Sequence, residues 1–352
     1  MKLAKLAVGI LATIGLLGVN QVTALGAWPE ELADLPEWEV TSSSYGGKLL
    51  LSDSPEMVNA DGIMYQDAVV GNARLFFHHV NDTKTDKVIV AVLENNGEEP
   101  AEVVVHRYGL GGPDDDWIKV GKAAQRAYFA GGDLYIVRIP SHGTALLTPE
   151  LGAVVVKPGM LVNGIYDFMA NRKVTVKTVM APVGVKIENF IKQAKVLPAD
   201  SQRLRGTFDG CDRLLIGARL YNPLSDGSVA VTLADNVIDT YVGGVDATDG
   251  SKVLNYGNYG IVYNIFLPAT GDNDISYYMN PRGGIYAGAI GIKYRHTLLD
   301  PVETPNDRLF MGKDTVLDYS AVGKFKGQES LWLTFSPPGA SNLPVRLIIK
   351  PE

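Results

Sequence analysis

The chain has 352 residues, a net charge of −7 at pH 7 and a single cysteine. This length is enough for two domains with cores of their own. The acidic balance argues against nucleic acid as a partner, because nucleic acid needs a basic face, and it argues against anionic membrane surfaces as well. The lone Cys211 excludes an internal disulfide, and such a residue is more often a small buried apolar side chain than a reactive thiol.

The first 24 residues have the features of an export signal. Lys2 and Lys5 give a positively charged start, residues 6–19 are apolar, and residues 22–24 form a small-residue cleavage site. The alternative is an uncleaved membrane anchor, but the apolar segment is shorter than the roughly 20 residues that a spanning helix needs. We therefore predict a signal peptide at 1–24, a secreted or cell-envelope location, and no stable membrane insertion after processing. Export without disulfides is typical of a bacterial protein that relies on packed sheets.

The first half of the mature chain has a β pattern. Residues 25–44 are acidic and proline-containing, and they predict an irregular lead-in segment. A first domain is predicted over 45–185. Strands are expected at 74–80, 87–93 and 101–106, which are rich in β-branched and aromatic residues. In 87–93 both alternating sets of side chains are apolar, so this strand is predicted to be covered on both faces.

Two segments depart from the β pattern. Residues 118–129 are the best helix candidate of the first half, and the aspartates at 114–116 before them suit a helix N-terminus electrostatically. Residues 187–197 predict a second short helix, ended by Pro198. We place a linker containing this helix at 186–205, between the two domains.

The second domain is predicted over 206–352. Residues 262–267 and 275–279 are apolar strand candidates, and a proline-containing turn follows each. Residues 241–258 are rich in glycine and asparagine and predict a long loop. The apolar segment 343–350 at the end of the chain is expected to pair into the sheet of this domain. Many short strands with Gly/Pro turns and few helices predict an all-β fold of two β-sandwich-like domains.

The two domains are predicted to be copies of one β-unit. A Gly-Tyr-Pro-Gly pattern at 132, 135, 140 and 143 recurs with the same spacing from Gly260 onward, 128 residues later. Upstream, Asn81 and Asn95 recur 141 residues later as Asn222 and Asn236. Ordered matches with only simple length changes favour a duplication over chance similarity between β-rich segments, and a repeat of this length indicates tandem domains.

The candidate ligand site lies in the aromatic-rich second domain. Tyr256, Tyr259 and Tyr278 are tyrosines of this region, and Asn280 and Arg282 stand in the adjoining turn. Aromatic faces with amide and arginine donors suit polyhydroxyl ligands, so these five residues predict a sugar-stacking surface. The alternative is that the tyrosines are ordinary strand residues with their hydroxyls at the sheet edge.

Histidines suggest a second candidate site. His78 and His79 are adjacent on a predicted strand, so their side chains face opposite sides. If either one meets His106 across a hairpin, the pair forms part of a metal site. In this hypothesis His78 and His106 are the ligands. A metal site needs three or more converging ligands, and ordinary sheet-surface histidines are the alternative. The aspartates at 114–116 suggest Ca²⁺, against a solvated acidic loop. No cofactor is predicted.

No catalytic constellation is recognisable in the sequence. It contains neither a G-x-S-x-G nor an H-E-x-x-H motif. A carboxylate pair for glycoside hydrolysis is defined by the distance between its two groups, and the sequence does not select such a pair from its 39 acids.

Three segments of the second half carry a family resemblance: YGNYGIVYNIFLP, MNPRGGIYAGAI and PPGASNLPVRLIIKP. They resemble uncharacterised secreted β-rich proteins of Gram-positive-type bacteria that are often described as having a copper amine oxidase N-terminal-like domain. That description refers to a short accessory domain and does not imply an oxidase. The oxidase forms its quinone from a tyrosine in Asn-Tyr-(Asp/Glu), whereas Tyr256 and Tyr259 are both followed by glycine here, and its His-x-His pair is missing. No functional residue carries over.

The sequence therefore predicts a secreted, non-enzymatic cell-envelope or extracellular protein that binds polysaccharide. One alternative is a secreted carbohydrate-active hydrolase, which needs a carboxylate pair in one cleft. The other alternative is an envelope metal-binding protein. The identity of the ligand, the oligomeric state and the relative orientation of the domains are left open by the sequence.

Overall fold

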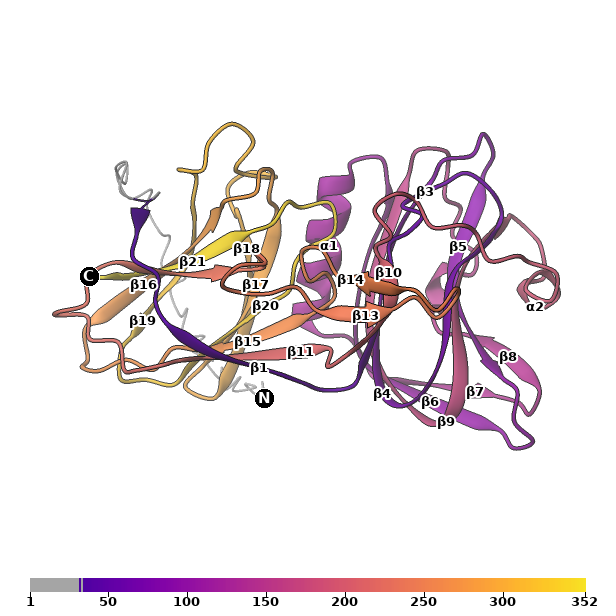
Figure 1. The fold of residues 1–352 in the computed structure, drawn as a ribbon, viewed down its shortest axis with the longest axis horizontal. Coiled ribbons are helices and arrows are strands. Elements are labelled where there is room, and N and C mark those ends of the chain that lie inside the picture. The colour runs from indigo at the N-terminus through magenta and orange to yellow at the C-terminus, as the bar shows by residue number, and fades with distance from the viewer. Residues whose placement is uncertain (1–31, 33) are drawn as a thin grey trace, which may run out of the picture.

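The computed structural model of this chain describes residues 32 and 34–352. The predicted signal peptide at 1–24 lies outside the described residues. The chain forms two β-rich halves that lie side by side, with helix α1 between them (Figure 1). The fold is all-β, as predicted, with two α-helices in the described part of the chain. Neither of these helices has the length and apolar character that a bilayer-spanning helix requires.

The first half is built on an 11-stranded sheet. Its strands are β2 (Lys48–Ser52), β3 (Met57–Val58), β4 (Gly62–Asn81), β5 (Lys87–Asn95), β6 (Ala101–Asp114), β7 (Tyr135–Ile139), β8 (Gly143–Leu146), β9 (Leu161–Pro182), β10 (Arg205–Asp209), β13 (Gly243–Val245) and β14 (Lys252–Leu254). The long strands β4 and β9 pair with each other over most of their length. The first part of β9 also pairs with β6 and its second part with β5.

This sheet bends in the middle of its two longest strands. The β4–β9 pairing shifts register between Val69 and Gly71, and Gly71 has a φ of +76°, a conformation that glycine adopts without strain. The bend lets β5 and β6 enclose a common apolar core. Residues 88–93 of β5 are all buried, which confirms that this strand is covered on both faces.

The second half is a β-sandwich. Its six-stranded sheet has the order β1 (Val40–Tyr45), β11 (Asp212–Gly217), β15 (Val262–Phe266), β20 (Leu331–Phe335), β17 (Gly288–Tyr294) and β18 (Thr297–Thr304). Its four-stranded sheet has the order β12 (Val229–Leu233), β21 (Val345–Pro351), β16 (Asp274–Pro281) and β19 (Ser320–Lys326). Ile265 and Leu333 from one sheet share a core with Ile275 and Leu347 from the other. The final strand β21 pairs with β12 and β16, as the apolar chain end predicted.

Strand pairing crosses the predicted linker at 186–205. Strand β1 falls in the segment expected to be irregular, and it pairs with β11 of the second half. In return β10 pairs with β2 of the first half, and β13 and β14 extend that sheet from within the segment 241–258, which was expected to be a loop. Adding β10 satisfies the backbone groups at the edge of β2. The sheets therefore do not divide at the linker, and the domain limits 45–185 and 206–352 stay a prediction.

The two helices differ in how well the sequence located them. Helix α1 (Trp117–Ala130) begins and ends one residue outside the predicted range, and the side chain of Asp116 caps it by accepting a hydrogen bond from the Lys119 N–H at 3.1 Å. Helix α2 (Ile187–Phe190) is much shorter than expected. The chain after it becomes extended beside β4, because the N–H of Leu197 donates to the Ile63 carbonyl at 2.8 Å.

Helix α1 joins the two halves. It packs on β6 and β9 of the first half and on β17 and β18 of the second. The Gln125 side chain donates to the Ser336 carbonyl and accepts from the Ala289 N–H. Gly121 lies so close to Gly339 that a Cβ atom at 121 would overlap the Gly339 carbonyl oxygen. The two halves are therefore tightly packed along this helix.

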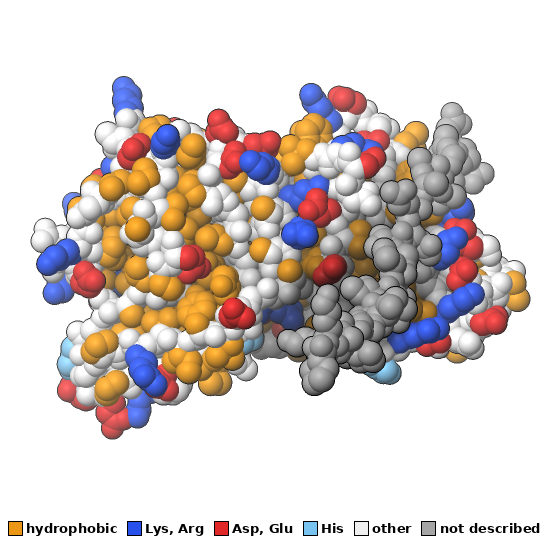
Figure 2. Space-filling model, turned by 180° about the vertical axis from the view of Figure 1, so that it is seen from behind, with side chains coloured by type: hydrophobic (Ala, Val, Ile, Leu, Met, Phe, Trp, Pro, Cys, Tyr) orange, Lys and Arg blue, Asp and Glu red, His pale blue; other side chains and the backbone are white. Residues whose placement is uncertain are grey.

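The outer surface carries apolar side chains as well as charges. Figure 2 shows the molecule from behind, where apolar side chains gather over part of the face and charged ones are scattered among them. On the first half, Ile136 of β7 and Met169 of β9 are 50% and 42% exposed. The described part of the chain covers each of these two residues only in part, and single exposed apolar residues of this kind are ordinary on a protein surface.

Candidate functional site

A pocket of about 740 Å³ lies where the two halves meet, at the N-terminal end of α1. We call it the seam pocket. Its lining comes from the β2–β3 turn, from β4, from the start of α1, from the segment just before β10, and from two loops of the second half. The lining residues are Asp53, Glu56, His78, Asp115, Asp116, Trp117, Ile118, Leu204, Tyr259, Ala340, Ser341 and Asn342. This size falls within the range of small-ligand sites.

The β2–β3 turn brings two acidic side chains to one wall. Asp53 directly follows β2, and its N–H donates to the Leu204 carbonyl at 3.0 Å. Asp200 fixes the turn, because its carboxylate accepts from the Ser54 hydroxyl at 2.8 Å and from the Glu56 N–H at 2.9 Å. The turn is thus held by backbone and side-chain bonds that leave the carboxyls of Asp53 and Glu56 directed toward the pocket.

Glu56 is paired with a buried histidine. Its Oε1 lies 3.6 Å from Nε2 of His78, which is 2% exposed. The interaction with His78 lowers the pKa of Glu56. Nδ1 of His78 is buried without a hydrogen-bond partner and faces Gly339, where a Cβ atom would collide with it. Glu56 is therefore a carboxylate whose ionised form is favoured by the neighbouring imidazole.

The pKa of Asp53 is shifted in the opposite direction from that of Glu56. Its Oδ1 is buried and has no hydrogen-bond partner. Burial raises the pKa of the Asp53 carboxyl well above its usual value, and the negative charges of Glu56 and Asp200 raise it further. The seam pocket therefore holds two neighbouring carboxyls whose pKa values are shifted in opposite directions, an arrangement that recurs at functional sites.

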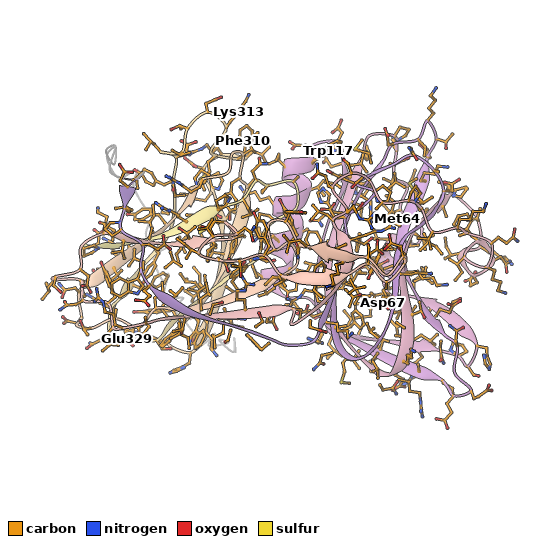
Figure 3. The ribbon with its side chains drawn as sticks, in the orientation of Figure 1. Met64, Asp67, Trp117, Phe310, Lys313 and Glu329 are labelled. Carbon is orange, nitrogen blue, oxygen red and sulfur yellow. The ribbon has the colours of Figure 1, made fainter. Side chains whose placement is uncertain are left out.

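The start of α1 forms the second wall. Asp116 caps the helix, and Trp117 follows it, with an indole N–H that donates to the Gly159 carbonyl at 3.0 Å. Figure 3 shows Trp117 at the end of α1, between the two halves. The Trp117 side chain packs beside Val80 and Val120, so its ring is held in place and contributes an aromatic surface to the pocket.

Tyr259 forms the third wall, from the second half. Its hydroxyl donates to the Ser341 carbonyl at 2.6 Å, and Asn255 holds its backbone from both sides, at 2.9 and 2.8 Å. Burial raises the pKa of Tyr259, and the next contribution comes from the charge of Asp53. Tyr259 and Asp53 line the same pocket. The pocket thus combines two aromatic side chains with four carboxyls.

The five residues predicted to bind sugar do not form one surface. Tyr259 lines the seam pocket, and Tyr256 is 52% exposed with its ring edge against Tyr241. Tyr278 is 4% exposed and Asn280 is fully buried, with its amide donating to the carbonyls of Val316 and Asp318. The reason is that β16, which carries Tyr278 and Asn280, is an inner strand between β19 and β21 with apolar clusters on its faces.

Arg282 also stands apart from the pocket. It follows β16 in a turn, is partly buried, and its N–H donates to the Pro344 carbonyl at 3.0 Å. Of the predicted five, Tyr259 lines the seam pocket and the other four do not.

The two histidines of the metal hypothesis do not meet. His78 lies opposite Asn163 of β9, whereas His106 stands on β6 beside the positions opposite Asp167 and Phe168. At about 3.3 Å per residue these positions are about 15 Å apart along β9, and β4 and β6 pair with β9 on opposite sides. His106 is exposed, while His78 pairs with Glu56. No cluster of three or more metal-ligating side chains occurs among residues 32 and 34–352.

Sequence reasoning missed Asp53, Glu56 and Trp117 as site residues. Asp53 and Glu56 stand in the segment Asp-Ser-Pro-Glu, directly after the apolar residues of β2, and a carboxyl at the end of a strand was the one available signal. The aspartates at 114–116 were recognised as an acidic segment, and two of them line the pocket. Their proximity to Asp53 depends on contacts between residues far apart in the chain.

The fold and the site define an all-β protein with an acidic, aromatic pocket between its two halves. Neither a protein-family model nor a curated protein matches the chain. Among solved structures, it is similar to the CUB1-EGF-CUB2 domain of human MASP-1/3, with 10% sequence identity, a TM-score of 0.22, and coverage of 82% of this chain and 99% of that chain. A likeness this weak carries no functional argument.

Proposed function

We propose that this is a secreted, non-enzymatic protein of the bacterial cell envelope or extracellular space that binds polysaccharide in the seam pocket. The export signal predicted at 1–24 supports the location. The proposal also includes the tandem duplication predicted from the sequence, in which the two β-units are copies of one secreted module. The resemblance to secreted β-rich bacterial proteins agrees with it.

The observation that carries the proposal is the composition of the seam pocket. Trp117 and Tyr259 supply aromatic surfaces on which the apolar faces of a sugar ring stack. Asp53 and Glu56 supply oxygen atoms that accept hydrogen bonds from sugar hydroxyls, and the amide of Asn342 both donates and accepts. A few polar groups beside aromatic walls in a cavity of this size are typical of small-ligand sites.

The test is co-sedimentation of the exported protein with purified cell-wall polymer across a salt series. We expect saturable binding that Trp117→Leu weakens. The matched control is Trp332→Leu, since Trp332 is also partly buried but stacks on Phe266 of the second half and does not line the pocket. Equal binding by both variants, or no binding at any salt concentration, contradicts the proposal.

A second candidate function, carbohydrate hydrolysis, is favoured by the opposed pKa shifts of Asp53 and Glu56. A glycoside hydrolase needs one protonated carboxyl as general acid and one ionised carboxylate in the same cleft. Incubation of the polymer with the protein, followed by a reducing-end assay, separates the two functions. Reducing ends that appear with the wild type, but not with Asp53→Asn or Glu56→Gln, establish hydrolysis and refute the non-enzymatic proposal.

A further inference from the structure

The charge of the seam pocket selects among polysaccharides. Four carboxyl-bearing residues line it, from the β2–β3 turn and from the start of α1, and no lysine or arginine is among the described residues of its lining. The pocket therefore has a negative potential, which concentrates cations and repels acidic sugars. A neutral sugar gains hydrogen bonds to these carboxyls, and a ligand with a positive charge gains the attraction of the negative potential as well.

Three of these acids can be compared by the partners they already have. Glu56 faces the imidazole of His78, and Asp116 accepts from the Lys119 N–H at the start of α1. Asp53 has no such partner, because its Oδ1 is buried and makes no hydrogen bond. Leaving a buried carboxyl unpaired is costly. The Asp53 carboxyl therefore has an oxygen without a hydrogen-bond donor, whereas Glu56 and Asp116 each have a partner.

The aromatic walls add the second requirement. An ammonium group next to an aromatic ring is attracted to the ring face, and a sugar ring stacks on it. Trp117 is fixed by its bond to the Gly159 carbonyl and Tyr259 by its bond to the Ser341 carbonyl, so neither ring has to be ordered by the ligand. Both rings line the same pocket as the carboxyls, and Asp116 directly precedes Trp117 in the chain.

We propose that the seam pocket binds sugar units with a free amino group, as in a polymer of de-N-acetylated hexosamine, and that Asp53 accepts a hydrogen bond from the ammonium. The inference rests on the proposed polysaccharide-binding function and narrows its ligand class. The ammonium supplies the positive charge and the donor that Asp53 lacks. The sugar ring occupies the space between Trp117 and Tyr259. An N-acetylated unit has neither the charge nor the donor in the same form.

The experiment compares oligosaccharides of equal length by isothermal titration calorimetry with the exported protein. The probes are a glucosamine hexamer, an N-acetylglucosamine hexamer and a glucose hexamer. We expect the glucosamine hexamer to bind about ten-fold more tightly or better, which is the factor that one charge-assisted hydrogen bond supplies. The preference should shrink as salt is raised, since exposed charges are screened.

Variants and a peptide probe make each outcome decisive. Asp53→Asn should remove the preference for the amino sugar and leave binding of the acetylated hexamer in place. The control is Asp209→Asn, because the Asp209 side chain is 95% exposed on β10 and does not line the pocket. Equal binding of the glucosamine and acetylated hexamers overturns the inference and keeps the polysaccharide function. Binding of no hexamer overturns both, and equally tight binding of a lysine hexamer overturns the assignment to a sugar.

Discussion

Replacing Arg74 should destabilise the fold more than any surface charge does. Arg74 is 3% exposed, and its guanidinium binds both oxygens of Asp167 at 2.5 and 3.0 Å. It also donates to Asp212 at 3.0 Å, and to the carbonyls of Cys211 and Gly260 at 2.5 and 3.2 Å. These acceptors come from both halves of the protein. The arginine is therefore a buried cation shared across the seam.

The size of the effect follows from what Arg74→Met would leave behind. Asp167 would keep one donor, the Tyr128 hydroxyl at 2.6 Å, but no paired cation. Methionine fills a similar volume, so lost packing contributes little. Removing one partner of a buried ion pair costs about 3–5 kcal/mol. We expect the free energy of unfolding to fall by this amount, measured by urea denaturation followed through tryptophan fluorescence.

A surface pair and a double variant test the reasoning. Arg138 and Glu102 form a bond of 3.0 Å with side chains 79% and 46% exposed, so Arg138→Met should cost less than about 1 kcal/mol. Arg74→Met combined with Asp167→Leu should cost less than Arg74→Met alone, because the carboxylate of Asp167 is no longer left buried without its cation; Asp212, whose side chain is 21% exposed, loses Arg74 in both variants. A single Arg74→Met variant within about 1 kcal/mol of the wild type, or a double variant that loses the sum of both single effects, would refute this account.

Three further predictions concern single residues. Burial lowers the pKa of His79 to about 3, so below about pH 6.5 the unfolded chain takes up a proton that the folded protein does not. The free energy of unfolding should therefore fall from pH 6.5 toward pH 3, by at most about 1.4 kcal/mol per pH unit from this residue. In His79→Gln, the midpoint of urea unfolding should change less steeply with pH than in the wild type. Gly121→Ala should lower the thermal midpoint of unfolding, because the overlap with Gly339 costs about 1–3 kcal/mol and the better helix propensity of alanine returns only about 1 kcal/mol. The control Gly243→Ala should leave the midpoint nearly unchanged, since a Cβ atom at 243 would meet open space. Burial raises the pKa of Cys211 to about 11, so a disulfide-exchange reagent should label it only after urea unfolding, and rapid labelling of the native protein would contradict this.

Much of the fold was predictable because it follows local patterns. The all-β class, the two-sided burial of β5, helix α1 and the pairing of the final strand β21 all follow from periodicity, propensity and turn residues. The pairing of β1 with β11 and of β10 with β2 did not follow from them. Each is a contact between residues more than 100 positions apart, and no local property of either segment selects its partner.

The site was less predictable for the same reason. Tyr259 was recognised by its residue type, and the structure does place it in a pocket. Tyr278 has the same residue type, but it stands on an inner strand and is 4% exposed. Residue type alone does not tell an inner strand from a pocket wall. The two carboxyls of the β2–β3 turn became site residues only through packing against α1 and the second half.

The exchange of strands makes the seam pocket a property of the whole chain. Without β10, β13 and β14, the first sheet would end at the open edge of β2, directly before Asp53. Without β1, the second sandwich would end at β11, next to Asp212 and its bond to Arg74. Each half thus completes its sheet with a strand from the other half. One of these added strands lies next to the pocket, and the other lies next to the buried Arg74. A ligand that contacts Asp53 and Tyr259 at once binds only the assembled fold, so its binding energy adds to the stability of the contact between the halves.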